Sequence, residues 1–68
     1  MNEFFLESDY IELVKLIKLL DFAETGGMAK IMIESGEVSL NGLTEYRKKA
    51  KVRPGDVVEV DGEKIAVL

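Results

Sequence analysis

The 68-residue chain contains no cysteine, no histidine and no tryptophan, and it has a single proline. Without cysteine, the chain has no disulfides, no thiolate metal ligands and no thiol nucleophile, which fits a reducing cytoplasm. Without histidine, it lacks the commonest metal ligand and the usual general base. The sequence also shows no carboxylate pair arranged for acid/base catalysis and no nucleophile–base pair. We therefore expect a protein that is not an enzyme and that has no metal site and no cofactor.

Long apolar runs are absent as well. No stretch approaches the ~20 apolar residues that a membrane helix needs, and no signal peptide opens the chain. We therefore expect a cytoplasmic protein without a membrane partner. The 47% hydrophobic and 32% charged residues are typical of a folded globular domain. A chain of this length is too short for two cores, so residues 1–68 are predicted to form a single domain.

Positive charge is scarce overall, since the net charge is −4, but it is concentrated in one stretch. Five of the nine bases, and no acid, lie between Tyr46 and Arg53, and the rest of the chain carries four bases and 13 acids. Charges more than about 8 Å apart are largely screened at physiological salt, so a local basic patch on an acidic body can still attract phosphate. A solvated loop that only keeps the chain soluble is the alternative interpretation.

The centre of the chain, residues 25–42, predicts a helix followed by a strand and a tight turn. Thr25 is a good N-cap residue, and a helix beginning there is predicted over residues 26–35. Its apolar face is expected to consist of Met28, Ile31 and Met32, with the two methionines filling gaps between helix and sheet. Gly36 should end the helix, because a left-handed residue costs least without a Cβ. The Asn41-Gly42 pair that follows Val38 and Leu40 predicts a hairpin.

The flanking residues predict the remaining elements. A short strand is expected over residues 2–7 and a helix over residues 10–20, capped by Ser8 or Asp9. The apolar stripe of this helix comprises Leu13, Val14, Ile17 and Leu20, with Leu16 at its margin. After the second helix, strands are expected at residues 43–45, 57–60 and 65–68, with the basic stretch as a loop or irregular edge. Asp61-Gly62 predicts a second hairpin turn, between the last two strands. Together they predict an α+β fold, in which a two-helix hairpin packs on a small, mostly antiparallel sheet.

The order of these motifs resembles the small RNA-binding domain named after ribosomal protein S4. The most specific parts are Ala29-Lys30, Ile33, Gly36, Val38 and Asn41-Gly42 in one run, and the turn Arg53-Pro54-Gly55-Asp56 at a fixed distance from it. The resemblance spans residues 10–60 and is greatest to small bacterial members in which this domain is nearly the whole protein. It implies an αL-shaped RNA-binding surface, made by the two helices, the loop between them and the following hairpin.

The resemblance also implies which residues contact RNA. On the helices these are Lys18, Thr25, Gly26, Gly27 and Lys30; in the hairpin and the basic stretch they are Asn41, Arg47, Lys48 and Lys51, with Lys49 as an additional base. Asn41 has an alternative explanation, because an Asn-Gly pair tolerates positive φ and can serve the turn alone. Tyr46 either stacks on a base or packs on the core or at an edge of the fold, and packing is the favoured interpretation. Three departures from the family pattern, at Glu12, Gly26 and Ala50, shift the expected contacts toward residues 47–51.

The sequence thus predicts a non-catalytic RNA-binding protein that docks on structured ribosomal RNA or on an assembling ribosomal subunit. The contacts would come from the basic loop and a helix N-terminus, and ribosomal proteins are further candidate partners. The alternative is a protein-interaction module whose acidic side chains bind a basic ribosomal or replication protein; these are Glu7, Asp9, Glu12 and Glu34. The oligomeric state stays open, because a terminal strand can pair between copies.

Overall fold

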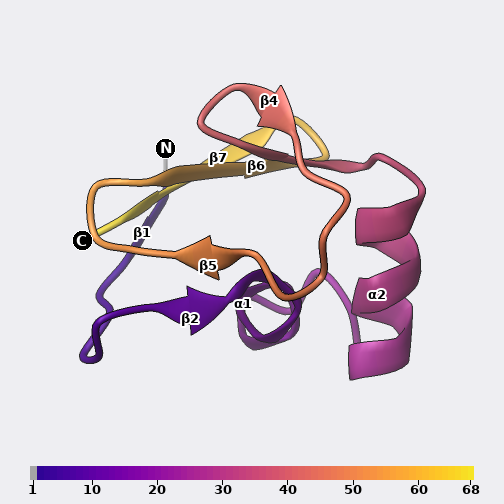
Figure 1. Cartoon of the computed structure of the whole chain (residues 1–68), viewed down its shortest axis with the longest axis horizontal. Helices are drawn as coiled ribbons and strands as arrows, with labels where there is room; N and C mark the ends of the chain where they lie inside the picture. The colour runs from indigo at the N-terminus through magenta and orange to yellow at the C-terminus, as the bar shows by residue number, and fades with distance from the viewer. Residues whose placement is uncertain (1) are drawn as a thin grey trace.

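The computed structural model describes residues 2–68 of the chain. These residues contain seven short strands and two helices (Figure 1). In chain order they are β1 (Asn2–Phe4), β2 (Ile11–Glu12), α1 (Leu13–Leu19), α2 (Gly26–Glu34), β3 (Val38–Leu40), β4 (Leu43–Thr44), β5 (Lys51–Val52), β6 (Val57–Val60) and β7 (Glu63–Val67). Figure 1 shows the large sheet on one side of the molecule and α1, with the β2–β5 pair, on the other. The predicted α+β class is confirmed.

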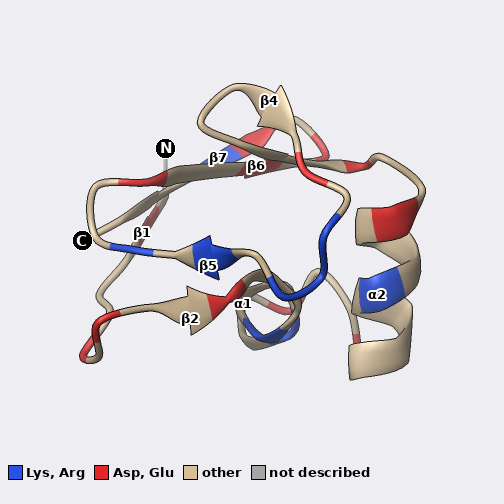
Figure 2. Ribbon diagram, in the orientation of Figure 1, with Lys and Arg blue, Asp and Glu red and all other residues tan. Residues whose placement is uncertain are grey.

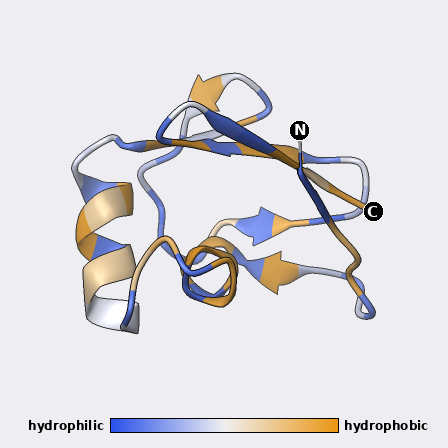
Figure 3. Cartoon of the chain, turned by 180° about the vertical axis from the view of Figure 1, so that it is seen from behind, coloured by the Kyte–Doolittle hydropathy of each residue, from blue (hydrophilic) through white to orange (hydrophobic). Residues whose placement is uncertain are grey.

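The main sheet has five strands in the order β1-β7-β6-β3-β4. β1 pairs with β7 in parallel, and the other pairs are antiparallel. Every second residue of the two central strands is buried, namely Val58 and Val60 on β6 and Ile65 and Val67 on β7. This alternation turns one face of the sheet toward the helices. Figure 3 shows hydrophobic stretches in the strands of the sheet and in both helices.

The tight turns of the sheet follow the sequence prediction. Asn41 and Gly42 have φ values of 52° and 86°, and Asp61 and Gly62 have 51° and 77°. Two successive positive φ values are the requirement of a two-residue type I′ hairpin turn, which explains why Asn-Gly and Asp-Gly pairs occupy these positions. Both predicted hairpins are therefore confirmed.

Helix α2 begins and ends as its sequence predicts. The Thr25 Oγ1 accepts a hydrogen bond of 3.1 Å from the Met28 amide, which satisfies one of the amides that a helix start leaves unpaired. At the other end, Gly36 takes a φ of 86°, and its amide donates to the Ile33 carbonyl while the Glu37 amide donates back into the last turn. This pair of bonds is the Schellman arrangement that favours glycine.

The buried face of α2 differs from the predicted one. Ala29 and Ile33 are fully buried, whereas Met28 is 47% exposed and Ile31 is 66% exposed. Met32 is half-buried and packs against the core. Because a helix has 3.6 residues per turn, a residue two positions from Ile33 lies on nearly the opposite side, and Ile31 therefore faces away from the sheet. The expectation that Met28 and Ile31 form the core-facing stripe is wrong.

Helix α1 begins later than predicted. Residues 11 and 12 form strand β2, which pairs with β5 as a separate two-stranded sheet, and the N-cap is Glu12, whose side chain makes no capping bond. The predicted capping by Ser8 or Asp9 is therefore wrong. Leu16, expected at the margin of the apolar stripe, is fully buried beside Leu13 and Ile17. Neither helix of the described residues is long and apolar enough to cross a membrane.

The two isoleucines of α2 provide a matched test of this packing. We expect Ile33→Val to lower the free energy of unfolding by about 0.5–1.5 kcal/mol, because it removes a fully buried methyl group. The same change at the exposed Ile31 should stay within about 0.5 kcal/mol of the wild type. Urea denaturation of both variants measures the difference. Equal losses would show that the orientation of α2 is not the one described.

Candidate nucleic-acid interface

The stretch of residues 47–53, hereafter the basic segment, is fixed against the N-terminus of α1. The Leu13 amide donates a 2.9 Å hydrogen bond to the Ala50 carbonyl, and the Val14 amide donates another of 2.9 Å to the Lys48 carbonyl. These amides belong to the helix start that lacks a side-chain cap. Figure 2 shows the basic segment passing from β4 to α1 and into β5. Main-chain carbonyls of the basic segment therefore take the place of a cap.

Two buried side chains also anchor the basic segment. Ala50 is 5% exposed, and Val52 is fully buried in the core. The prediction of a loop or irregular edge is wrong for Lys51 and Val52, which form β5 opposite β2. This pairing joins residues about 40 positions apart, so no local sequence pattern announces it. The cations of the basic segment are thus carried by a backbone that is tied to the fold at several points.

Four of the five cations of the basic segment surround one hollow of about 390 Å³. Arg47, Lys49, Lys51 and Arg53 line it together with Ala50, and no carboxylate does. All four cationic residues are exposed, while Lys48 is half-buried. A concave surface lined by charges of one sign focuses their potential and attracts the opposite charge. We call this surface the basic hollow.

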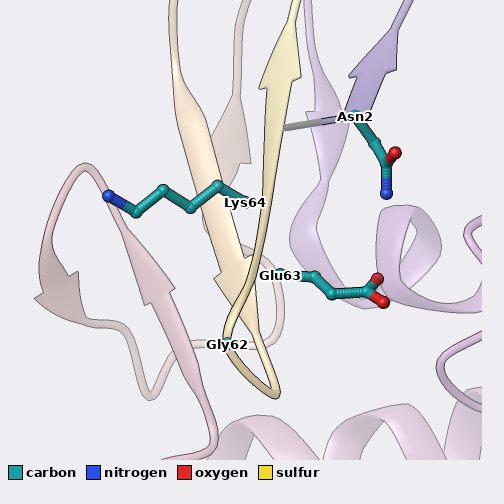
Figure 4. A pocket seen from close by; sticks show the side chains of 4 residues that line it. All are labelled: Asn2, Gly62, Glu63 and Lys64. Atoms are coloured by element: carbon teal, nitrogen blue, oxygen red, sulfur yellow. The ribbon is translucent and has the colours of Figure 1, made fainter.

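Other hollows of the described residues lack this concentration of charge. The one shown in Figure 4 has a volume of about 330 Å³ and is lined by Asn2, Gly62, Glu63 and Lys64. It combines one cation with one carboxylate, and their side chains point in different directions. Among residues 2–68, no three Asp, Glu, His or Cys side chains lie close enough together to hold a metal ion.

Arg47 is held in place by Glu45. The guanidinium Nε and Nη2 donate to the two carboxylate oxygens at 3.0 Å each, and the Arg47 amide donates to the same carboxylate at 3.1 Å. Hydrogen bonding to Arg47 lowers the pKa of the Glu45 carboxyl, and the carboxylate raises the pKa of Arg47. Because the Arg47 side chain is still 78% exposed, this pair orients the guanidinium more than it stabilises the fold. Sequence reasoning did not identify this pair.

Asn41 is occupied by hydrogen bonds within the fold. Its Nδ2 donates to Asp56 Oδ1 at 3.0 Å, and its Oδ1 accepts from the Val57 amide at 2.8 Å. The other carboxylate oxygen of Asp56 accepts from the Arg53 amide at 2.8 Å. Asn41 therefore connects its own hairpin turn to the turn that follows the basic segment. These contacts agree with the alternative in which Asn41 serves the turn, and the residue does not line the basic hollow.

The glycines at the start of α2 have no packing explanation within the chain. A Cβ added at Gly26 would meet no atom within 4 Å, and one at Gly27 would meet only Thr25 Oγ1 at 3.8 Å. Neither glycine has a positive φ. Their amides are the first two of the helix and have no partner within it. The helix start thus offers bare backbone to an approaching group.

The two predicted helix lysines lie apart from the basic hollow. Lys18 is exposed in the last turn of α1, and Lys30 is exposed on α2, but neither lines the hollow. Among residues 2–68, the structure shows no ion pair between Lys30 and Glu34, although their i,i+4 spacing on a helix would allow one. The structure therefore brings together three of the predicted residues, Arg47, Lys49 and Lys51, while the predicted residues on the helices do not line the basic hollow.

Sequence reasoning missed Tyr10 and left Arg53 out of the candidate contacts. Arg53 belongs to the basic segment, so its charge could have identified it as a candidate RNA contact. Tyr10 was assigned to a helix, but it lies beside β2 with its ring 4.9 Å from Lys51 Nζ, measured to the ring centroid. Tyr46 is 60% exposed, and a Cβ added at Gly36 would lie 3.4 Å from its ring. This proximity favours edge packing for Tyr46.

Comparison with known proteins gives a consistent family assignment. Residues 4–68 match the model of the S4 domain. The chain is 37% identical over 59 residues to YbcJ of Escherichia coli, covering 87% of this chain and 84% of that protein. It is 36% identical over 61 residues to RlbA of Bacillus subtilis, which is named a probable ribosome maturation protein, covering 90% and 86% of the two chains.

The solved structures agree with these sequence matches. The solution structure of Escherichia coli YbcJ, described for an αL motif involved in RNA binding, superimposes with a TM-score of 0.74 at 36% identity, covering all of this chain and 87% of that one. The 30S ribosomal protein S4e of Thermoplasma acidophilum superimposes with a TM-score of 0.70 at 27% identity. That match covers 85% of this chain and 31% of the ribosomal protein.

The hydrogen bonds of Asn41 predict a stability effect that the other hairpin turn should not share. Asn41→Gly keeps the positive φ but removes both side-chain bonds, so the free energy of unfolding should fall by about 1–2 kcal/mol. Asp61→Gly is the matched control, because Asp61 has a φ of 51° and makes no such side-chain bond; it should change stability by less than about 0.5 kcal/mol. Urea denaturation compares them, and equal effects would exclude the structural role of Asn41.

Proposed function

Because the chain belongs to the S4 domain family, we propose that it binds RNA, without catalysing a reaction, through the basic segment and the N-terminus of α2. The observation that carries this proposal is the basic hollow, which is lined by Arg47, Lys49, Lys51 and Arg53 and by no carboxylate. Within residues 2–68, only Arg47 of these four is paired, with Glu45 outside the lining. Phosphates supply most of the affinity in protein–nucleic acid complexes, and clustered lysines and arginines are their usual partners. The hollow supplies these partners on a body that is otherwise acidic.

The backbone attachment of the basic segment favours a preformed binding surface. Two hydrogen bonds to α1, the strand pairing with β2 and the burial of Ala50 and Val52 fix the backbone that carries the cations. A surface that is already ordered loses less conformational entropy on binding than a mobile loop does. On this proposal, five bases on an ordered backbone are enough for binding in a chain with a net charge of −4.

The target that we propose is structured ribosomal RNA, bound free or in an assembling ribosomal subunit. RlbA is named a probable ribosome maturation protein, and part of the 30S ribosomal protein S4e has the same fold as this chain. RNA helices are recognised mainly through their shape, their 2′-hydroxyls and their phosphates, which suits a compact basic surface. Ribosomal proteins next to the bound RNA are additional candidate partners.

The first test compares charge reversal inside and outside the basic hollow. Lys49→Glu and Lys64→Glu change the net charge equally, but only Lys49 lines the basic hollow. Binding of the wild type to purified bacterial ribosomal RNA should fall with salt with a log–log slope of about −3 to −4, since four phosphate contacts give about −3 on a single strand and a steeper slope on a duplex. Lys49→Glu should weaken binding at least tenfold and make the slope shallower by about 1. Lys64→Glu should cause a smaller loss with little change of slope, and equal effects of both variants would contradict the proposed surface.

The second test uses the glycine at the start of α2. Gly27→Ala should raise the free energy of unfolding by about 0.5 kcal/mol, because alanine favours the helix and the added Cβ finds room. The same methyl group should hinder close approach of the RNA backbone, so affinity for ribosomal RNA should fall several-fold. Urea denaturation of Gly27→Ala gives its free energy of unfolding, and binding measurements at the salt concentration used for the wild type give its affinity for ribosomal RNA. If the variant is more stable but binds RNA with unchanged affinity, the N-terminus of α2 is not part of the interface.

A further inference from the structure

The two-stranded sheet of β2 and β5 has an inner and an outer face. Ile11 pairs with Val52, and both pack in or against the core, while Glu12 pairs with Lys51. Because successive side chains of a strand point to opposite faces, Glu12 and Lys51 lie on the outer face. The Lys51 ammonium reaches over the Tyr10 ring, which places Tyr10 beside them. An aromatic ring thus borders the basic hollow that Lys51 lines.

Tyr10 stands between two hollows. Through Lys51 it adjoins the basic hollow, and with Ser8, Ile11, Glu12 and Lys15 it lines another of about 310 Å³. The residue is 42% exposed, and the Ser8 hydroxyl donates a 2.9 Å hydrogen bond to its carbonyl, which helps to fix the turn before β2. A partly exposed aromatic ring beside a phosphate-attracting surface is the usual arrangement for stacking an unpaired base. We call the second hollow the tyrosine hollow.

We propose that Tyr10 stacks on an unpaired base of the bound RNA, with the base in the tyrosine hollow and its flanking phosphate in the basic hollow. This inference rests on the proposed RNA binding and specifies its substrate class, a structured RNA that presents an unpaired nucleotide. The bases of a continuous RNA helix are stacked inside it and are out of reach of a side chain on the protein surface. Lys51 connects the two hollows, since it lines the basic hollow and contacts the ring of Tyr10, which lines the tyrosine hollow.

The other aromatic residue near the basic segment is less suited to this role. The ring of Tyr46 lies close to Gly36, and the residue lines neither the basic hollow nor the tyrosine hollow. Glu12 is the acid on the outer face of the small sheet, opposite Lys51. Its carboxylate accepts hydrogen bonds and repels phosphate, so it favours the edge of a base over the backbone in the tyrosine hollow.

Two short RNA hairpins with the same compact tetraloop test the proposal. One, the paired hairpin, has a fully paired stem, and the other is identical except for a single unpaired 2-aminopurine nucleotide that bulges from the stem. The wild type should bind the hairpin with the unpaired nucleotide about tenfold more tightly, and binding should quench the 2-aminopurine fluorescence. Tyr10→Leu should abolish both the preference and the quenching while leaving affinity for the paired hairpin unchanged. Tyr10→Phe keeps the ring and should retain both. Urea denaturation of the variants checks that the fold is intact.

Because the chain has no tryptophan, the fluorescence of its tyrosines gives a second, independent measurement of stacking. The chain has two tyrosines, so Tyr46→Phe leaves Tyr10 as the only one. Its emission should change on binding the hairpin with the unpaired nucleotide and not on binding the paired hairpin. The same experiment on Tyr10→Phe, in which only Tyr46 emits, should give no difference between the two RNAs.

The outcomes separate the proposal from the function on which it rests. If both hairpins bind equally and Tyr10→Leu changes nothing, the stacking role is excluded and RNA binding stands. If a preference exists but survives Tyr10→Leu, another residue receives the base and the proposal is wrong. If the wild type binds neither hairpin nor ribosomal RNA, both the stacking role and the proposed function are overturned.

Discussion

The structure depends on two hydrogen bonds, from the Leu13 and Val14 amides to the carbonyls of Ala50 and Lys48. Helix α1 has only seven residues and no side-chain cap, so its first amides need acceptors from elsewhere in the chain. The basic segment supplies them, and in doing so it is drawn against α1 and into the pairing of β5 with β2. One set of contacts thus starts the helix and positions the cations of the candidate RNA-binding surface.

Local interactions explain how much of the fold could be predicted. The Thr25 cap, the Gly36 helix end and the two hairpin turns each depend on residues a few positions apart, and all four occur as predicted. Elements whose partners are distant could not be predicted in this way. Strand β2 forms because β5 lies beside it. The apolar spacing of residues 10–20 is also that of a helix, so the sequence shows no sign of this pairing.

The candidate site shows the same division. The basic segment was recognisable from its charge alone, because five cations without an acid are unusual in an acidic chain. The role of Asn41 depends on Asp56, fifteen residues away, and the position of Tyr10 depends on Lys51 across the small sheet. Both relationships arise from tertiary packing. The exposure of Ile31 arises likewise from how α2 is rotated on the sheet, since both of its sides carry apolar residues.

The central claim is that the basic segment, held against α1, is a preformed surface for RNA. Ultraviolet crosslinking in cells that express the protein, followed by mass spectrometry of the crosslinked peptides and sequencing of the attached RNA, tests it most directly. The account predicts crosslinks to peptides that contain residues 47–53 and the start of α2, attached to one region of ribosomal RNA. Crosslinks confined to β6 and β7, or no RNA above background, would contradict it.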